Sequence, residues 1–216
     1  MLGILDSGKG GENTAAEILR LDPSAEILLH LDRENAPYGE RTEAELIPIV
    51  ERGIMRLFEM GAEKILLACC TASSVYDRLS QPAREIAIPI TKPVAGRALE
   101  MAGGGKIALI ATERTVASGE FLKHLGDSLA LSVPASGLVR LIEDGASDEN
   151  FTSEAAEYLD GILSPLADSD VRVLILGCTH FSSLRAGIKE RLARLTTNKI
   201  MIADSATIAA LSIIDN

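Results

Sequence analysis

Short apolar runs alternate with amphipathic helical patterns along the whole 216-residue chain. This alternation is typical of β-α units, which fold into parallel sheets covered by helices. We expect an α/β fold with two similar lobes built on mainly parallel sheets, and an active site in the cleft between them. The predicted strands are Met1–Leu5, Glu26–Leu31, Lys64–Ala68, Ala87–Ile90, Lys106–Ala111, Leu129–Val133, Val171–Leu176 and Lys199–Ile202.

Helical patterns fill the intervals between these runs. The best marked pattern opens with a capping box, Thr42 with Glu45, and then carries apolar residues from Leu46 to Phe58 on one face. Pro48 lies inside it, so the helix either bends there or begins later than the cap. The other predicted helices are Thr14–Leu21, Ser73–Leu79, Val94–Met101, Gly119–Leu125, Leu138–Glu143, Ser153–Leu163, Ser183–Leu195 and Ser205–Ile214.

The composition excludes several classes of protein. A formal net charge of −10 argues against a nucleic-acid scaffold or a membrane-surface protein, since both need clustered Lys and Arg. No apolar run approaches the roughly 20 residues that span a bilayer, and Met1–Leu5 runs into Asp6 without the apolar core of a signal peptide. Three cysteines, two of them adjacent, do not form a disulfide framework. We therefore expect a cytoplasmic protein with reduced thiols.

Two strand ends carry a similar pattern, in which a small residue is followed by cysteine and then closely by threonine. Ala68-Cys69-Cys70-Thr71 follows one buried run, and Gly177-Cys178-Thr179 follows another. The region around Gly103-Gly104-Gly105 is the natural place for the chain to cross between halves. Parallel sheets bind ligands beyond the carboxyl ends of their strands, so we expect Cys69 and Cys178 to face one cleft.

A cysteine at the start of a helix can have a lowered pKa, because unpaired N–H groups stabilise the thiolate. Taken alone, Cys69 or Cys178 is most simply a small buried apolar residue, but the matching positions favour a chemical role. Cys70 should point to the opposite side from Cys69, because adjacent side chains of an extended segment diverge. The spacing of these cysteines and His180 fits no usual zinc pattern, so we expect no metal.

The segment Asp6-Ser7-Gly8-Lys9-Gly10-Gly11 follows the first strand. A glycine-rich loop there can turn sharply and aim N–H groups at an anion, although Asp6 alone could simply cap a helix. It is neither a dinucleotide fingerprint nor a Walker A loop. His180, two residues after Cys178, could be its proton partner or a structural residue. Glu143 either ends a solvated helix or turns inward to orient His180.

Together these segments resemble the glutamate racemase family, within the aspartate/glutamate racemase superfamily. The matching pieces run in family order over nearly the whole chain. They are Asp6-Ser7-Gly8 with Gly10-Gly11, Pro37-Tyr38-Gly39, Ala68-Cys69, Thr71-Ala72-Ser73, Ala111-Thr112-Glu113 with Thr115, Ser118-Gly119, Glu143 with Gly145, and Gly177-Cys178-Thr179-His180. The resemblance implies cofactor-independent racemisation of glutamate, in which one cysteine removes the α-proton and the other protonates the opposite face. In a bacterium this would supply D-glutamate for peptidoglycan.

The resemblance also implies a role for each site residue. Cys69 would deprotonate the D-isomer with help from Asp6, and Cys178 would deprotonate the L-isomer with help from His180 and Glu143. The residues expected to hold the substrate are Ser7, Pro37, Tyr38, Gly39, Cys70, Thr71 and Thr179. Family architecture assigns residues 1–91 plus 199–216 to the first lobe and 92–198 to the second. By analogy the protein could form a homodimer.

Two departures from the family pattern keep alternatives open. Family members usually carry Asn at the position of Cys70, where it touches the substrate, and Tyr-Pro at the position of Phe181-Ser182. A site built around polar contacts discriminates sharply by them. One alternative is a paralogue that racemises another acidic substrate, such as aspartate or a hydantoin. The other is a non-catalytic amino-acid-binding or regulatory protein. A single-cysteine decarboxylase is less attractive because both thiols are present.

Overall fold

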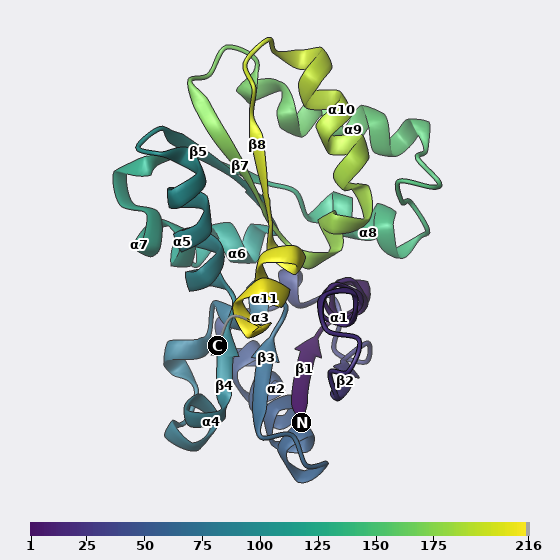
Figure 1. The fold of residues 1–216 in the computed structure, drawn as a ribbon, viewed down its shortest axis with the longest axis vertical. Coiled ribbons are helices and arrows are strands. Elements are labelled where there is room, and N and C mark those ends of the chain that lie inside the picture. Colours follow the sequence, from purple (N-terminus) through teal and green to yellow (C-terminus); the bar gives the residue numbers. More distant parts are fainter. Residues whose placement is uncertain (215–216) are drawn as a thin grey trace.

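Two four-stranded sheets, one above the other in Figure 1, form the framework of the computed structural model, which describes residues 1–214. Every neighbouring pair of strands is parallel, which confirms the predicted two-lobed α/β fold. The first sheet has the order β2-β1-β3-β4 and consists of β1 (Leu2–Asp6), β2 (Ile27–Leu31), β3 (Lys64–Leu67) and β4 (Ala87–Pro89). The second has the order β6-β5-β7-β8 and consists of β5 (Lys106–Ala111), β6 (Leu129–Pro134), β7 (Val171–Gly177) and β8 (Met201–Asp204).

The strand registers bring the functional segments to the facing edges of the sheets. Leu5 of β1 is paired with Leu67 of β3, and Ala111 of β5 with Gly177 of β7. The inner strands are apolar runs because helices cover both of their faces; in β7 only Arg172 is exposed. The chain therefore leaves β1, β3, β5 and β7 in loops that meet between the lobes.

Helices of the first lobe follow from local sequence signals with three exceptions: the start of the first helix, the segment Ser73–Leu79, and Gln81–Ile86, where no helix was predicted. The capping box of Thr42 and Glu45 is present, and the helix continues through Pro48 without a later start. The first helix begins at Lys9 rather than Thr14. The elements are α1 (Lys9–Leu21), η1 (Tyr38–Glu40), α2 (Glu43–Glu59), α3 (Cys70–Ser73), η2 (Tyr76–Arg78) and α4 (Gln81–Ile86).

The helix predicted over Ser73–Leu79 is wrong. The short helix α3 ends at Ser73, and the chain then turns into the 3-10 segment η2. Two hydroxyls explain the break: Ser73 Oγ donates to the carbonyl of Leu67 at 2.9 Å, and Ser74 Oγ donates to that of Thr71 at 2.7 Å. Such side-chain bonds compete with a continuing helix.

The second lobe carries the remaining helices. They are α5 (Thr91–Ala102), α6 (Glu113–Ala117), α7 (Glu120–Leu125), η3 (Gly126–Ser128), α8 (Ser136–Glu143), α9 (Ser153–Leu163), η4 (Ser164–Leu166), η5 (Thr179–Leu184), α10 (Arg185–Leu195) and α11 (Ser205–Ile214). Within residues 1–214, none of the helices combines the length and apolarity that crossing a membrane requires.

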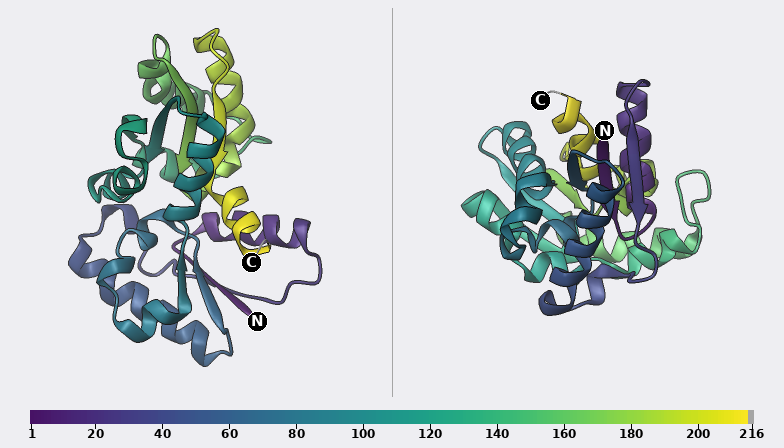
Figure 2. Two further views of the ribbon diagram at one scale, coloured as in Figure 1. Left: turned by 60° about the vertical axis from the view of Figure 1, so that its left-hand side comes forward. Right: turned by 90° about the horizontal axis from the view of Figure 1, so that it is seen from below.

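The assignment of residues 199–216 to the first lobe is wrong for the strand. β8 pairs with β7, Leu176 lying opposite Asp204, so it is an edge strand of the second sheet. The free edge of β7 offers an apolar strand its hydrogen-bonding partner. The following helix α11 then reaches the junction of the lobes and packs against α1 and α5 (Figures 1 and 2). Residues 215 and 216 lie outside the described part.

A shared apolar core joins the lobes on this side. It contains Ile18 of α1, Leu66 of β3, Ala98 of α5, Ile175 of β7 and Ile208 of α11, all buried. Each lobe has a further core on the other face of its sheet. The lobes are therefore held together by apolar packing behind the two cysteine loops.

Candidate active site

Cys69 and Cys178 line one small cavity from opposite lobes. Each is the first residue of a turn that follows an inner strand: Cys69 caps α3, and Cys178 caps η5. The cavity has a volume of about 30 Å³. Its walls come from Ser7, Pro37, Tyr38, Gly39, Glu40, Cys69 and Thr71 of the first lobe, and Thr112, Ser136, Val139, Arg140, Cys178 and His180 of the second.

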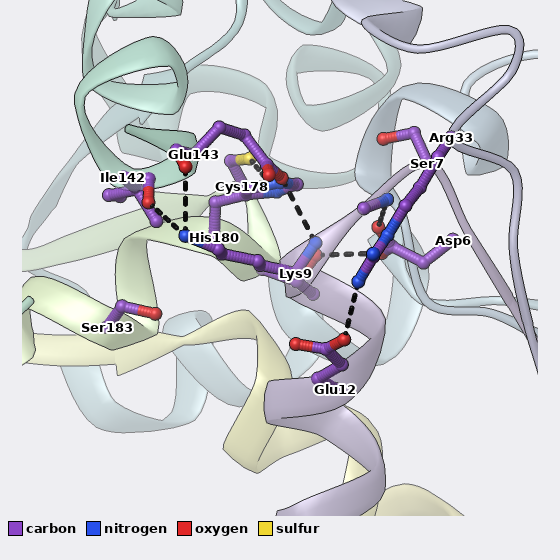
Figure 3. A network of polar contacts seen from close by, with 12 residues as sticks. Asp6, Ser7, Lys9, Glu12, Arg33, Ile142, Glu143, Cys178, His180 and Ser183 are labelled. Carbon is purple, nitrogen blue, oxygen red and sulfur yellow. Dashed lines mark hydrogen bonds and ion pairs between the residues drawn. The ribbon is translucent and has the colours of Figure 1, made fainter. Parts of the chain in front are cut away.

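A histidine and a carboxylate stand behind Cys178. His180 Nδ1 lies 3.7 Å from Cys178 Sγ, and its Nε2 lies 2.6 Å from Glu143 Oε1 (Figure 3). The hydrogen bond to His180, helped by the N–H of Lys9, lowers the pKa of Glu143 to about 2 despite the opposing effect of burial. Glu143 is therefore ionised at neutral pH and turns inward, which the sequence had left open. It can orient the imidazole and stabilise its charged form.

Lys9 of the first lobe contacts the chain of Cys178, His180 and Glu143, which we call the relay. No role had been predicted for Lys9 from the sequence. Its backbone N–H donates to Glu143 Oε1 at 3.1 Å. Its Nζ donates to the carbonyls of Ile142 at 2.7 Å and Glu143 at 3.0 Å, so a cation caps the end of α8 (Figure 3). Its place inside the glycine-rich loop was the only signal in the sequence.

Two glycines let this loop press against the second lobe. A Cβ at Gly8 would lie 2.5 Å from Glu143 Oε1, and a Cβ at Gly10 would lie 2.1 Å from Thr179 Oγ1. Both distances are far below any normal contact. The glycines thus serve close approach between the lobes.

The surroundings of Cys69 are different. Its Sγ lies 3.9 Å from Ser7 Oγ, and the N–H groups of Ala72 and Thr71 face it. Burial, with a smaller effect from the charge of Asp6, raises its pKa to about 12, although these N–H groups oppose the shift. Burial also raises the pKa of Cys178 well above the ordinary thiol value, and charge on Cys69 would raise it further. Both residues are therefore neutral thiols at pH 7 in this environment.

Asp6 is completely buried beside the relay. Its carboxylate accepts the N–H of Gly8 at 2.9 Å and the hydroxyl of Thr179 at 3.0 Å. Burial raises its pKa, and the nearby His180 opposes this shift. The carboxylate of Asp6 also acts on Cys69 through its charge, and its expected assistance to Cys69 stays a prediction.

Hydroxyl groups from both lobes meet at another wall of the cavity. Thr71 Oγ1 lies 3.0 Å from both Thr112 Oγ1 and Thr115 Oγ1, and Thr112 donates to Thr115 at 2.9 Å. Tyr38, on the first-lobe side, donates its hydroxyl to Asp32 at 2.7 Å. Burial and then this contact raise the pKa of Tyr38, so it remains a neutral donor.

The structure brings most of the predicted residues together. Ser7, Pro37, Tyr38, Gly39 and Thr71 line the cavity with both thiols and His180. Thr179 instead donates its hydroxyl hydrogen to Asp6. The side chain of Cys70 points away from the cavity into the shared core, where its thiol donates to Ser205 Oγ at 3.6 Å. This divergence of Cys69 and Cys70 agrees with the sequence analysis.

Five wall residues were not predicted from the sequence: Glu40, Thr112, Ser136, Val139 and Arg140. Thr112 lies in a segment that matched the family pattern, but no role had been assigned to it. Glu40 and Arg140 form an ion pair across the two lobes, and nothing in the local sequence connects residues that far apart. Within residues 1–214 the structure contains no group of three or more His, Cys, Asp or Glu side chains that could hold a metal ion.

Comparison with known proteins finds racemases. The family described as Asp/Glu/Hydantoin racemase matches residues 13–213. A glutamate racemase of Desulforudis audaxviator is 33% identical over 210 residues, covering 95% of this chain and 74% of the relative. One from Leptospira interrogans is 34% identical over 217 residues, covering 97% and 80%. A crystal structure of a Bacillus anthracis glutamate racemase isoform, 30% identical, superposes with a TM-score of 0.88 and covers 100% of this chain and 80% of that chain. A Francisella tularensis glutamate racemase in complex with D-glutamate, 22% identical, shares the fold with a TM-score of 0.85 over 99% and 79%.

Proposed function

Since this chain belongs to the Asp/Glu/hydantoin racemase family, we propose that it interconverts L- and D-glutamate with Cys69 and Cys178 as its two acid–base groups. One observation carries the proposal: the two thiols enter a single cavity from opposite lobes. Inversion at a carbon requires a base on one face and an acid on the other. A pair of facing strand-end cysteines supplies both.

The reaction needs one thiolate and one thiol at a time. In the L-to-D direction, the Cys178 thiolate takes the α-proton, the electron pair of the broken C–H bond stays on the substrate, and the Cys69 thiol delivers its proton to the other face. After this step Cys178 is a thiol and Cys69 is a thiolate. The site is then prepared for the D-to-L reaction only, until the two groups exchange protons with solvent. No cofactor is required by this scheme.

The raised pKa values of the thiols imply that binding itself prepares the base. The substrate brings an ammonium group close to both sulfur atoms, and a nearby positive charge lowers a thiol pKa. His180, held by Glu143, is placed 3.7 Å from Cys178 to accept its proton. On the other side, the N–H groups of Ala72 and Thr71 support negative charge on Cys69.

Hydroxyl groups can hold the substrate's α-carboxylate. Ser7 reaches toward Cys69, and Thr71 with Thr112 spans the two lobes at the opposite wall. Such fixed donors also stabilise the charge that develops on the α-carboxylate when the carbanion forms. Affinity for a dianion on a chain of net charge −10 then depends on these local donors.

Deuterium exchange tests the proposal. With L-glutamate in deuterated water, we expect D-glutamate that carries deuterium at the α-carbon from the first turnovers, because the protonating thiol has equilibrated with solvent. Since the enantiomers have equal free energies, kcat/KM must also be equal in both directions. Exchange with aspartate or a hydantoin but not with glutamate would favour the paralogue, and binding without exchange would favour a non-catalytic protein.

The biological setting follows from this activity. D-glutamate is a peptidoglycan precursor in the family's known role, and the reaction would belong in the cytoplasm where the thiols stay reduced. A homodimer remains a prediction by analogy, which light scattering of the purified protein would check.

A further inference from the structure

The small cavity that both thiols line adjoins a wider vestibule, and the residues shared by the two spaces form a wall between them. On one side lies the inner cavity of about 30 Å³, and on the other an outer vestibule of about 580 Å³. The residues that line both spaces are Ser7, Pro37, Glu40, Val139, Arg140 and His180. The inner cavity holds roughly two water molecules. A dicarboxylic amino acid is several times larger, so this wall must part before the substrate reaches the sulfur atoms.

An ion pair ties the wall together across the cleft. Glu40 belongs to η1 of the first lobe, and Arg140 belongs to α8 of the second. Both side chains face water, with 46% of Glu40 and 71% of Arg140 exposed. Exposed pairs contribute little net free energy, because solvent screens them. Breaking this pair is therefore easy.

Arg140 is also the one Lys or Arg among the residues that line the inner cavity in the described chain. It lies one helical turn before Glu143, so both residues project from the cleft-facing side of α8. A guanidinium group binds a carboxylate through two parallel hydrogen bonds. A carboxylate that enters the vestibule can therefore replace that of Glu40 on Arg140, and water can solvate the half-exposed carboxylate that Glu40 then presents.

We propose that Arg140 determines specificity by exchanging its partner: it leaves Glu40 and binds the side-chain carboxylate of the incoming substrate. This exchange opens the wall and selects amino acids with an acidic side chain in one step. The inference rests on the proposed racemase function and names how its substrate class is recognised.

Replacing Arg140 and replacing Glu40 should change KM in opposite directions, and this difference tests the exchange. Arg140→Gln removes the receptor of the carboxylate, and we expect KM for both enantiomers of glutamate to rise about tenfold with a smaller change in kcat. Glu40→Gln removes the competitor, and we expect KM to fall up to about fivefold. Arg140→Lys should recover part of the affinity, because it restores the charge but not the paired geometry.

Arg33 offers a matched control. It lines the vestibule but not the inner cavity, is 67% exposed, and pairs with Glu12 inside the first lobe. Arg33→Gln removes the same charge without touching the cross-lobe pair, so its KM should stay within about twofold of wild type. An equal rise of KM in Arg33→Gln and Arg140→Gln would mean that only the net charge of the vestibule matters, and it would overturn the proposal.

A change of KM in the same direction in Glu40→Gln and Arg140→Gln would also overturn it. An ion pair that only holds the wall closed would be broken equally by the loss of either partner. Circular dichroism and thermal unfolding verify that these surface variants fold. If wild type turns over no acidic amino acid, the proposed function fails separately. Calorimetric binding of glutamate must then show the same order of Kd: Glu40→Gln lowest, wild type next and Arg140→Gln highest.

Discussion

The two sides of the cleft present the same reactive group in different surroundings. Cys178 is backed by His180 and the ionised Glu143, which itself lines the vestibule. Cys69 has a serine hydroxyl and two backbone N–H groups, with the charge of Asp6 nearby. A reaction between mirror-image molecules thus does not demand a mirror-symmetric enzyme. In the proposed reaction, Cys178 would therefore exchange protons through His180 and Glu143, whereas backbone N–H groups would support negative charge on Cys69.

The largest effect is expected when either of the two thiols, the group that both sides of the cleft share, is replaced. Cys69→Ser and Cys178→Ser should each lower the racemisation rate by at least about 1,000-fold, because a hydroxyl is a far weaker acid than a thiol at neutral pH. Turnover is measured by circular dichroism of glutamate, and unchanged thermal unfolding shows that the fold is intact. Near-normal turnover of either variant would exclude the scheme with two thiols.

The next prediction separates the sides. His180→Gln removes the relay, and we expect kcat to fall by roughly 100-fold or more, in line with the usual contribution of a general acid–base group. Ser7→Ala removes one weak hydrogen bond beside Cys69 and should lower kcat less than about tenfold. Losses of equal size would mean that the asymmetry seen in the structure has no kinetic meaning.

Lys9 tests whether the first lobe supports the relay of the second. Lys9→Met removes the cation that caps α8, and we expect kcat to fall about threefold to tenfold and the free energy of unfolding to fall by about 1 kcal/mol. Steady-state kinetics and urea unfolding measure the two quantities. Lys9→Arg, which keeps the charge, should recover most of the stability; no difference between the variants would remove the capping role.

The smallest effect concerns acid stability. The pKa of Glu143 lies near 2 in the folded protein, below its ordinary value of 4.5. The associated stability is fully present above pH about 4.5 and is lost as the pH falls through about 2. Because Glu143 is partly exposed, the loss should stay below about 1 kcal/mol. Glu143→Gln should lack this component when unfolding is followed between pH 5 and 2; an unchanged pH profile would contradict it.

Local signals in the sequence predicted the elements that depend on their own residues. Thr42 with Glu45 marked the start of α2, and the apolar runs marked the inner strands. The start of α1 was placed too late, because the glycines before Thr14 have low helix propensity and are retained for contacts with Thr179 and Asp6. That reason lies in another part of the chain.

Long-range pairings could not be predicted in the same way. The run Met201–Asp204 fits the edge of either sheet, and only the structure shows that it joins β7. The cysteines and His180 were identified because their motifs are short and distinctive. Lys9 and Arg140 were missed because their partners lie 134 and 100 residues away, and an isolated surface cation resembles any other.

The small side chains of α11 carry a further consequence. Ala206, Ala209 and Ala210 are buried where this helix wedges between the lobes. A bulkier residue at Ala209 would push the two lobes apart on this side and change the angle between them. Displacing a reacting group by about 1 Å can cost 100-fold in rate. The alignment of Cys69 and Cys178 is thus set partly from the back of the protein, at a distance from the cavity that they line.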